Sequence, residues 1–334
     1  MRVTGERTAL SELDAIRVYG LPMRSRFRGV TVREGVLLGG PGGWGEFCPF
    51  EDYSDASSVP WLGAALESCA GGWPEPLRDR VPVNCTVPAV GPERAAEIVA
   101  GSGCATAKVK VAEPGQAPGE DVERVAAVRD ALGPSGAVRV DANAAWDVDE
   151  ATARIRELDR AAGGLEYVEQ PCPSVPELAA VRRKVDVRIA ADESIRRAED
   201  PMRVAVAGAA DVAVIKATPL GGVRRALRVA EASGLPCVVS SAVESSVGLA
   251  TELALAGALP ELPFACGLGT IALLDGDVVD DPLLPRDGHV PVLRAAPEPS
   301  PALVAAATPS AETQHRWLDR LRRVEELLAA GGGQ

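Results

Sequence analysis

Strand-like and helix-like segments alternate along the middle of the chain, from about residue 82 to residue 268. Short apolar runs rich in valine, alanine and isoleucine are separated by longer stretches in which leucine, alanine or valine recurs every three or four residues. The first pattern is typical of buried strands and the second of amphipathic helices. The strand candidates are VPVNCTV, ATAKVKV, AVRVDAN, LEYVEQ, VRIAADE, DVAVIKA, PCVVSSA and FACGLG.

Eight strand and helix units within about 190 residues predict an α/β fold, a (β/α)8-type barrel with its last unit trimmed. A doubly wound sheet is the alternative. It is less favoured because no GxGxxG turn follows the first strand, and because charged residues recur at most strand ends instead of at one switch point. We place the barrel domain at residues 81–284.

The flanking segments follow another pattern. The N-terminal region contains DAIRVYGL, GVTVREGVLLGG and WGEFCPF, which predict a short antiparallel meander, and then a helix through WLGAALESCAG. The glycine-rich GGPGGWGE lacks the GK[ST] ending of a phosphate loop, so we interpret it as a tight hairpin. A final helix at about 310–331 should pack on the N-terminal region, because it carries one apolar stripe. The stripe consists of Trp317, Leu318, Leu321, Val324 and Leu328. We therefore expect an α+β capping domain built from residues 1–80 and 285–334.

Composition narrows the classes of function. The formal net charge of −12 argues against a nucleic-acid partner, which needs a basic surface. The seven cysteines are scattered and form no CxxC pair, a pattern that favours reduced thiols over disulfides or a zinc site. The N-terminus has no apolar signal segment, and charges interrupt every longer apolar stretch. We expect a cytoplasmic protein without membrane insertion, and the sequence makes no prediction of oligomeric state.

Lysine is rare in this chain and lies mostly in predicted strands. Only four of the 35 basic residues are lysine; Lys108, Lys110 and Lys216 fall in apolar strand segments, whereas Lys184 lies in a helix-like stretch. A lysine can lose its proton when burial or a neighbouring charge lowers its pKa, and an arginine cannot. The three strand lysines therefore mark the expected site of proton transfer, and Lys108 would lower the pKa of Lys110 by like-charge repulsion.

The predicted strands end in charged residues at regular intervals. Lys110, Asp141, Glu169, Asp192 and Lys216 are separated by 31, 28, 23 and 24 residues, each about one strand and helix unit. The last inward side chains of barrel strands meet at the C-terminal mouth, where barrel enzymes assemble their sites. Each residue alone has an ordinary explanation, such as a solvated strand edge or a helix N-cap. Their recurrence at five successive strand ends has no such ordinary explanation.

Three carboxylates on adjacent strands form an oxygen-only site that suits Mg²⁺. Zinc is disfavoured, because the two histidines, His289 and His315, lie outside the predicted barrel strands. Lys110 and Lys216 would face each other across the metal. The predicted chemistry is removal of a proton alpha to a substrate carboxylate while Mg²⁺ stabilises the developing enediolate.

With these residues at its strand ends, the chain resembles the muconate-lactonizing subgroup of the enolase superfamily. The resemblance spans essentially the whole chain and rests on KVK (108–110), VDAN (140–143), VEQP (168–171), ADES (191–194) and VIK (214–216). It implies three metal ligands, Asp141, Glu169 and Asp192. It also implies that Mg²⁺, or alternatively Mn²⁺, is bound there and that Lys110 and Lys216 form an acid and base pair. Asn143 would support the metal ligands. The lack of a barrel histidine excludes the mandelate-racemase type.

Within that subgroup the chain most resembles the o-succinylbenzoate synthase family, the dehydratases of menaquinone biosynthesis. The resemblance rests on one residue, Arg139, and on two segments, SSAVESSVGL (240–249) and CGLGT (266–270). The resemblance implies substrate contacts from Arg139, Ser240, Ser241 and Gly267. Arg139 has an equally weighted alternative as a buried partner of a barrel carboxylate.

The implied reaction is dehydration of 2-succinyl-6-hydroxy-2,4-cyclohexadiene-1-carboxylate to o-succinylbenzoate. Lys110 would take the alpha proton and then protonate the departing hydroxyl, while Lys216 would stabilise the anion as a cation. The loops at 20–29 and 47–55 should close over this small carboxylate substrate.

Two alternatives stay open. An N-acylamino acid racemase or dipeptide epimerase would use the same metal site and exchange protons with both lysines. The epimerase is less favoured, because the eighth strand reads GLG where a DxD is expected. A non-catalytic barrel that serves as a binding protein is the second alternative, and the presence of all three carboxylates and both lysines argues against it.

Overall fold

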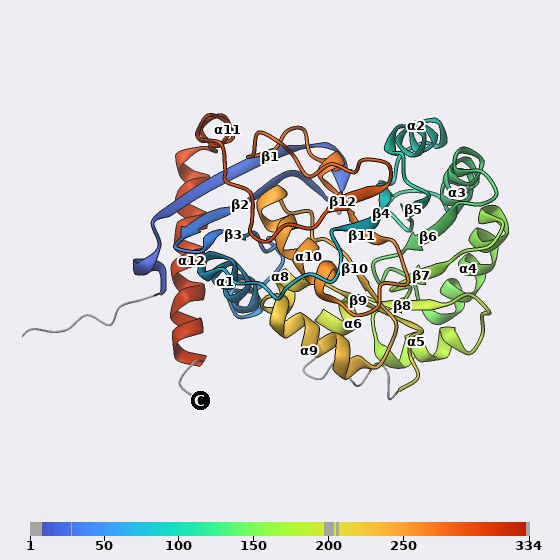
Figure 1. Ribbon diagram of the computed structural model, residues 1–334. Helices are drawn as coiled ribbons and strands as arrows, with labels where there is room; N and C mark the ends of the chain where they lie inside the picture. The colour runs from blue at the N-terminus through green and yellow to red at the C-terminus, as the bar shows by residue number, and fades with distance from the viewer. Residues whose placement is uncertain (1–8, 28, 197–203, 205–206, 332–334) are drawn as a thin grey trace, which may run out of the picture.

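The computed structural model describes residues 9–27, 29–196, 204 and 207–331. A capping unit, formed by a small sheet with helices against it, lies beside a larger barrel (Figure 1). A short 3₁₀ helix, η1 (Ala9–Glu12), precedes the sheet.

Three antiparallel strands form the sheet of the cap: β1 (Ala15–Phe27), β2 (Val30–Gly40) and β3 (Gly43–Phe47). The connection from β2 to β3 is a tight hairpin in which Gly40 pairs with Gly43. This confirms the interpretation of the glycine-rich segment as a turn. Helix α1 (Asp55–Ala70) lies directly on the sheet, because Gly45 has no β-carbon to collide with the carbonyl group of Ala65.

The barrel has the predicted parallel strands. In the described part of the chain there are eight, β4 (Arg80–Val87), β5 (Thr106–Lys110), β6 (Ala137–Asp141), β7 (Tyr167–Glu169), β8 (Ile189–Ala191), β9 (Val212–Ile215), β10 (Cys237–Val239) and β11 (Cys266–Gly269). Each pairs with the next, and β11 returns to β4. A bridge between Ser240 and Gly267 joins the two remaining strands and closes the ring. A β-carbon at residue 267 would lie 2.5 Å from Ser240 Oγ, so the close approach of the two strands favours glycine there.

Helices cover the outside of the barrel (Figure 1). They are α2 (Pro92–Ser102), α3 (Pro118–Leu132), α4 (Val148–Ala162), α5 (Val175–Arg182), α9 (Val223–Ser233) and α10 (Ser246–Ala258). Two short helices, α6 (Glu193–Arg196) and α8 (Ala217–Leu220), follow β8 and β9, and α8 packs against α1 of the cap. Helix α4 is representative: Asp147 caps its first turn, Ile155 and Leu158 are buried, and Gly163 ends it in a left-handed conformation. After β11 there is a short 3₁₀ helix, η2 (Ile271–Leu273), so the last unit is trimmed as predicted.

The C-terminal segment returns from the barrel to the cap through β12 (His289–Pro291), α11 (Pro301–Ala306) and α12 (Ala311–Gly331). Strand β12 pairs antiparallel with β4. These residues therefore lie on the barrel, although the sequence analysis assigned 285–334 to the cap. Helix α12 packs against α1 and β1. Trp317 and Leu321 are buried in that contact, whereas Leu318 is exposed because it points about 100° around the helix from Trp317.

Two further properties bear on function. None of the helices in the described ranges is long and apolar enough to span a membrane. All seven cysteines are buried free thiols.

Candidate active site

Charged side chains line up across neighbouring strands at the C-terminal mouth of the barrel. Lys110 is the register partner of Asp141, and Asp141 is the register partner of Glu169, so these residues lie side by side on β5, β6 and β7. Asp192 directly follows β8, and Lys216 directly follows β9. The structure therefore brings the five predicted residues to one mouth.

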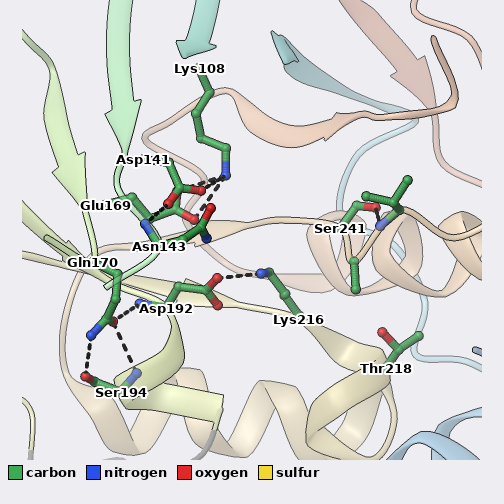
Figure 2. A network of polar contacts seen from close by, with 12 residues as sticks. Lys108, Asp141, Asn143, Glu169, Gln170, Asp192, Ser194, Lys216, Thr218 and Ser241 are labelled. Carbon is green, nitrogen blue, oxygen red and sulfur yellow. Dashed lines mark hydrogen bonds and ion pairs between the residues drawn. The ribbon is translucent and has the colours of Figure 1, made fainter. Parts of the chain in front are cut away.

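Lys108 and Lys110 both form ion pairs with these carboxylates. Lys108 Nζ donates to the two carboxylate oxygens of Glu169 at 3.0 and 2.9 Å, and it lies 3.4 Å from Asp141 Oδ2 (Figure 2). Lys110 Nζ donates to Asp141 Oδ2 at 2.5 Å and to Asn143 Oδ1 at 2.8 Å. The backbone N–H of Asn143 donates to Asp141 Oδ1 at 3.0 Å. Asn143 thus holds both the lysine and the carboxylate in place.

Lys216 approaches from the other side of the mouth. Its Nζ donates to Asp192 Oδ2 at 2.6 Å (Figure 2). Gln170 fixes the backbone there, because its Oε1 accepts from the N–H groups of Asp192 at 3.0 Å and of Ser194 at 3.2 Å. The Nε2 of Gln170 also donates to Ser194 Oγ at 2.8 Å. The sequence analysis gave Gln170 no role, although it belongs to the VEQP motif.

Burial and charge act in opposite directions on the pKa values of these groups. Burial disfavours the ammonium form of Lys108, but the charges of Glu169 and Asp141 outweigh it and raise the pKa. Burial also disfavours the charged form of Asp141, yet Lys110 and Lys108 hold its pKa well below the usual range. For Glu169, burial and the neighbouring Asp141 raise the pKa. Lys108 is therefore a fixed cation, and the negative charge of Glu169 is incompletely compensated.

A small cavity lies between these charges and the cap. Its volume is ≈ 30 Å³, which is large enough to hold water but small for an organic ligand. Lys108, Lys110 and Lys216 line it from the barrel. The cap contributes three aromatic side chains, Phe27, Phe50 and Trp61. The sequence analysis did not identify them, although Phe27 and Phe50 lie in the loops expected to close over the substrate.

Three of the four predicted substrate contacts line this cavity: Ser240, Ser241 and Gly267. Arg139 is not among its lining residues. Its Nε donates to Glu166 Oε2 at 2.5 Å, its Nη1 donates to the Ala265 carbonyl at 2.6 Å, and its guanidinium lies 4.7 Å from the centre of the Tyr167 ring. This geometry favours the alternative interpretation of Arg139, a buried partner of a barrel carboxylate.

The Ser241 hydroxyl is fully used within the protein. It donates to Glu244 Oε2 at 2.5 Å, and it accepts from Val243 N at 2.7 Å and from Thr270 Oγ1 at 2.8 Å. A serine hydroxyl has one proton and two lone pairs, so no hydrogen-bonding capacity is left for a substrate. Ser241 therefore shapes the loop after β10.

Two buried glutamates beside Lys216 were missed by the sequence analysis. Thr218 Oγ1 lies 2.9 Å from Glu244 Oε1 and 2.9 Å from Glu252 Oε1. Glu252 also accepts from the N–H groups of Ala217 and Thr218, directly after Lys216. A threonine hydroxyl has one proton, so both contacts are hydrogen bonds only when one of the two carboxyl groups is protonated. Burial, together with the nearby Glu244, raises the pKa of Glu252 to about 8, which favours that protonated form.

The donor set fits a hard divalent cation. Asp141, Glu169 and Asp192 supply carboxylate oxygens from three adjacent strand ends, and the raised pKa of Glu169 marks a place where more positive charge would be stabilising. Among the described residues, no group of three or more His, Cys, Asp or Glu side chains is arranged as a ready metal site. The lysine ammonium groups contact the carboxylate oxygens instead, so these ion pairs must rearrange when a metal binds.

Comparison with known proteins identifies the family. Enolase N-terminal domain-like and Enolase C-terminal domain-like models match residues 18–69 and 92–297. The o-succinylbenzoate synthase of Thermobifida fusca is 66% identical over 83% of this chain and 87% of that protein. The o-succinylbenzoate synthase of Mycolicibacterium smegmatis is 53% identical over 95% of this chain and 97% of that protein.

Solved structures show the same fold. The 2-chloromuconate cycloisomerase of Rhodococcus opacus matches with a TM-score of 0.73 and 23% identity, over 89% of this chain and 100% of that chain. The N-succinyl Arg/Lys racemase of Bacillus cereus matches with a TM-score of 0.73 and 20% identity, over 89% and 98%. The fold is thus that of the enolase superfamily. The two sequence relatives, both o-succinylbenzoate synthases, identify one family within it. The chain belongs to the o-succinylbenzoate synthase family of the enolase superfamily.

Proposed function

We infer that this protein catalyses the dehydration of 2-succinyl-6-hydroxy-2,4-cyclohexadiene-1-carboxylate to o-succinylbenzoate, a hydro-lyase reaction of menaquinone biosynthesis. Membership of the family supports this activity. The observation that carries the mechanism is that Lys110 and Lys216 border one cavity, next to the carboxylates at the barrel mouth.

Membership of the enolase superfamily implies a divalent metal, and we propose that it is Mg²⁺. Asp141, Glu169 and Asp192 would hold it, because they are the carboxylates at the three adjacent strand ends. When bound, the metal draws electron density from the substrate carboxylate and so makes the neighbouring C–H group more acidic.

Lys110 acts as the base and then as the acid. Its amine takes the proton from C1, the ring carbon that carries the carboxylate, and the bond from C6 to the hydroxyl oxygen breaks. The resulting ammonium gives the proton to the departing hydroxide, so one water leaves and the ring becomes aromatic. Lys108 keeps a fixed positive charge beside the carboxylates, and like-charge repulsion from it would favour the neutral amine of Lys110 during turnover.

Lys216 keeps its proton and stabilises the anion. Asp192 holds its ammonium at 2.6 Å, at the edge of the same cavity. A cation there lowers the energy of the negative charge that develops on the substrate. The aromatic side chains of Phe27, Phe50 and Trp61 exclude water, which strengthens these interactions.

The test is to incubate the protein with Mg²⁺ and the cyclohexadiene substrate and to follow formation of the aromatic product. Lys216→Arg, which keeps the cation but cannot release a proton, should retain a measurable rate of dehydration. Folded protein that binds Mg²⁺ but forms no aromatic product would contradict the proposed activity.

Racemisation of N-acylamino acids is a second candidate activity of the same site. The observation in its favour is that both lysines line the cavity, because a racemase needs a proton-transferring group on each wall. Incubation with an N-succinyl amino acid in D₂O tests it, because racemisation exchanges the alpha proton for deuterium. Lys216→Arg should abolish racemisation, although Lys110 can still exchange the alpha proton of the enantiomer that presents it to that side.

We also propose that the protein acts in the cytoplasm on a small carboxylate substrate. The seven buried free thiols support a reducing compartment.

A further inference from the structure

Arg33 links the cap to the barrel at the wall of the cavity. It lies on β2, and its side chain is only 3% exposed. Arg33 Nε donates to the Val243 carbonyl at 3.0 Å, and Nη2 donates to the Ala242 carbonyl at 3.2 Å. Nη2 also donates to the Cys48 carbonyl in the cap. Since Ala242 and Val243 line the cavity, one guanidinium fixes its barrel wall to the cap.

The same guanidinium also contacts a residue that lines the cavity from the cap. Its central carbon lies 4.5 Å from the centre of the Phe50 ring, a cation–π contact. Phe50 lines the cavity from the cap and follows Cys48 by two residues. Arg33 itself is not among the lining residues.

Val243 has an uncommon backbone conformation. Its φ is +63°, in the left-handed region that a β-branched residue rarely adopts. Such a conformation persists only where the surroundings hold it. Two contacts do so here: Ser241 Oγ accepts from Val243 N at 2.7 Å, and Arg33 Nε donates to the Val243 carbonyl.

We propose that Arg33 is a positioning residue that sets the shape of the substrate cavity. It holds Val243 in the left-handed conformation and keeps the Phe50 ring against the cavity. The effect on turnover rests on the proposed function, whereas the effect on the loop after β10 does not. Arg33 acts on the walls that surround the substrate, so its loss should weaken substrate binding more than it slows the chemical step.

The first test is Arg33→Lys, in which a single ammonium replaces a guanidinium that donates to four backbone carbonyl groups, those of Glu34, Cys48, Ala242 and Val243. KM should rise about tenfold or more while kcat falls less than about threefold, because displaced walls bind the substrate poorly. Arg78→Lys is the matched control. Arg78 also donates to backbone carbonyls, those of Ala256 and Leu259, but does not line the cavity. It should leave KM within about twofold of wild type.

The second test adds Val243→Gly, because glycine adopts a positive φ without support. Because Arg33 also supports the Phe50 ring, Arg33→Lys should still raise KM in the Val243→Gly background, but by a clearly smaller factor than in the wild-type background. The same rise in KM in both backgrounds would overturn the proposal.

The third test does not depend on the substrate. Backbone hydrogen exchange in the segment 240–249 should be faster in Arg33→Lys than in wild type and unchanged in Arg78→Lys. Unchanged exchange in Arg33→Lys would overturn the proposal, even if wild type proved inactive on the cyclohexadiene and the proposed function failed. If Arg33→Lys does not fold, Arg33→Gln, which keeps a planar amide donor, takes its place in all three experiments.

Discussion

Replacing Lys110 by arginine should remove the base while it keeps the positive charge. Lys110 Nζ contacts Asp141 Oδ2 at 2.5 Å and Asn143 Oδ1 at 2.8 Å, and a guanidinium can donate to both oxygens, so the variant should fold. Guanidinium does not release a proton near neutral pH. General acid and base catalysis typically contributes about 10²- to 10⁴-fold, so kcat should fall by that factor, or about 3–5 kcal/mol in activation free energy.

The assay follows formation of the aromatic product at saturating substrate and Mg²⁺. Lys184→Arg is the matched control, because Lys184 pairs with Asp149 at 3.0 Å on the surface and lies outside the cavity. It should leave kcat unchanged. Thermal unfolding of both variants checks that the fold is intact. A Lys110→Arg variant that retained kcat within about tenfold of wild type would refute the assignment of Lys110 as the base.

Three other changes probe the metal, the barrel closure and a buried carboxyl group. Chelation of the metal should abolish turnover, and turnover that survives chelation would count against a metal. Mg²⁺ at about 100 times its Kd should restore turnover and add about 2.7 kcal/mol to the free energy of unfolding, measured by thermal melting. Gly267→Ala should cost about 1–3 kcal/mol of stability and raise KM, because the new β-carbon would lie 2.5 Å from Ser240 Oγ; an unchanged melt would contradict this. Burial raises the pKa of Glu252 from 4.5 to about 8, so its contribution to stability is full below pH 4.5 and is lost as the pH rises through about 8. Denaturant unfolding at pH 6 and at pH 9 should therefore show that the free energy of unfolding falls less between these pH values in Glu252→Gln than in wild type. An equal fall in both proteins would argue against a buried protonated carboxyl group.

The charged strand ends could be predicted because they follow from local periodicity. Each is the last inward residue of a short apolar run, and the intervals match one strand and helix unit, so Lys110, Asp141 and Glu169 had to meet at one mouth. The same reasoning was less exact for Arg139. Arg139 faces the same way as Asp141 and is the register partner of Lys108, which does line the cavity. Its side chain is held instead by Glu166 and by the Ala265 carbonyl group, partners that local periodicity does not predict.

The cap walls could not be predicted from local patterns. The segments 20–29 and 47–55 were expected over the substrate from the family resemblance, but local periodicity does not show that Phe27, Phe50 and Trp61 are the side chains that reach the cavity. Glu252 was missed for a related reason. A glutamate on an amphipathic helix normally faces water, but α10 is buried almost throughout its length, so its carboxyl group had to find partners inside.

The size of the cavity has a kinetic consequence. The cavity measures ≈ 30 Å³, whereas pockets for organic ligands typically measure about 300–1,000 Å³. The substrate does not fit this cavity as it stands, so we expect the cap residues that line it, Phe27 and Phe50 among them, to move before the substrate enters. The contacts that shape the closed cavity also oppose its opening. The frequency of that opening sets an upper limit on kcat/KM, whatever the speed of proton transfer inside.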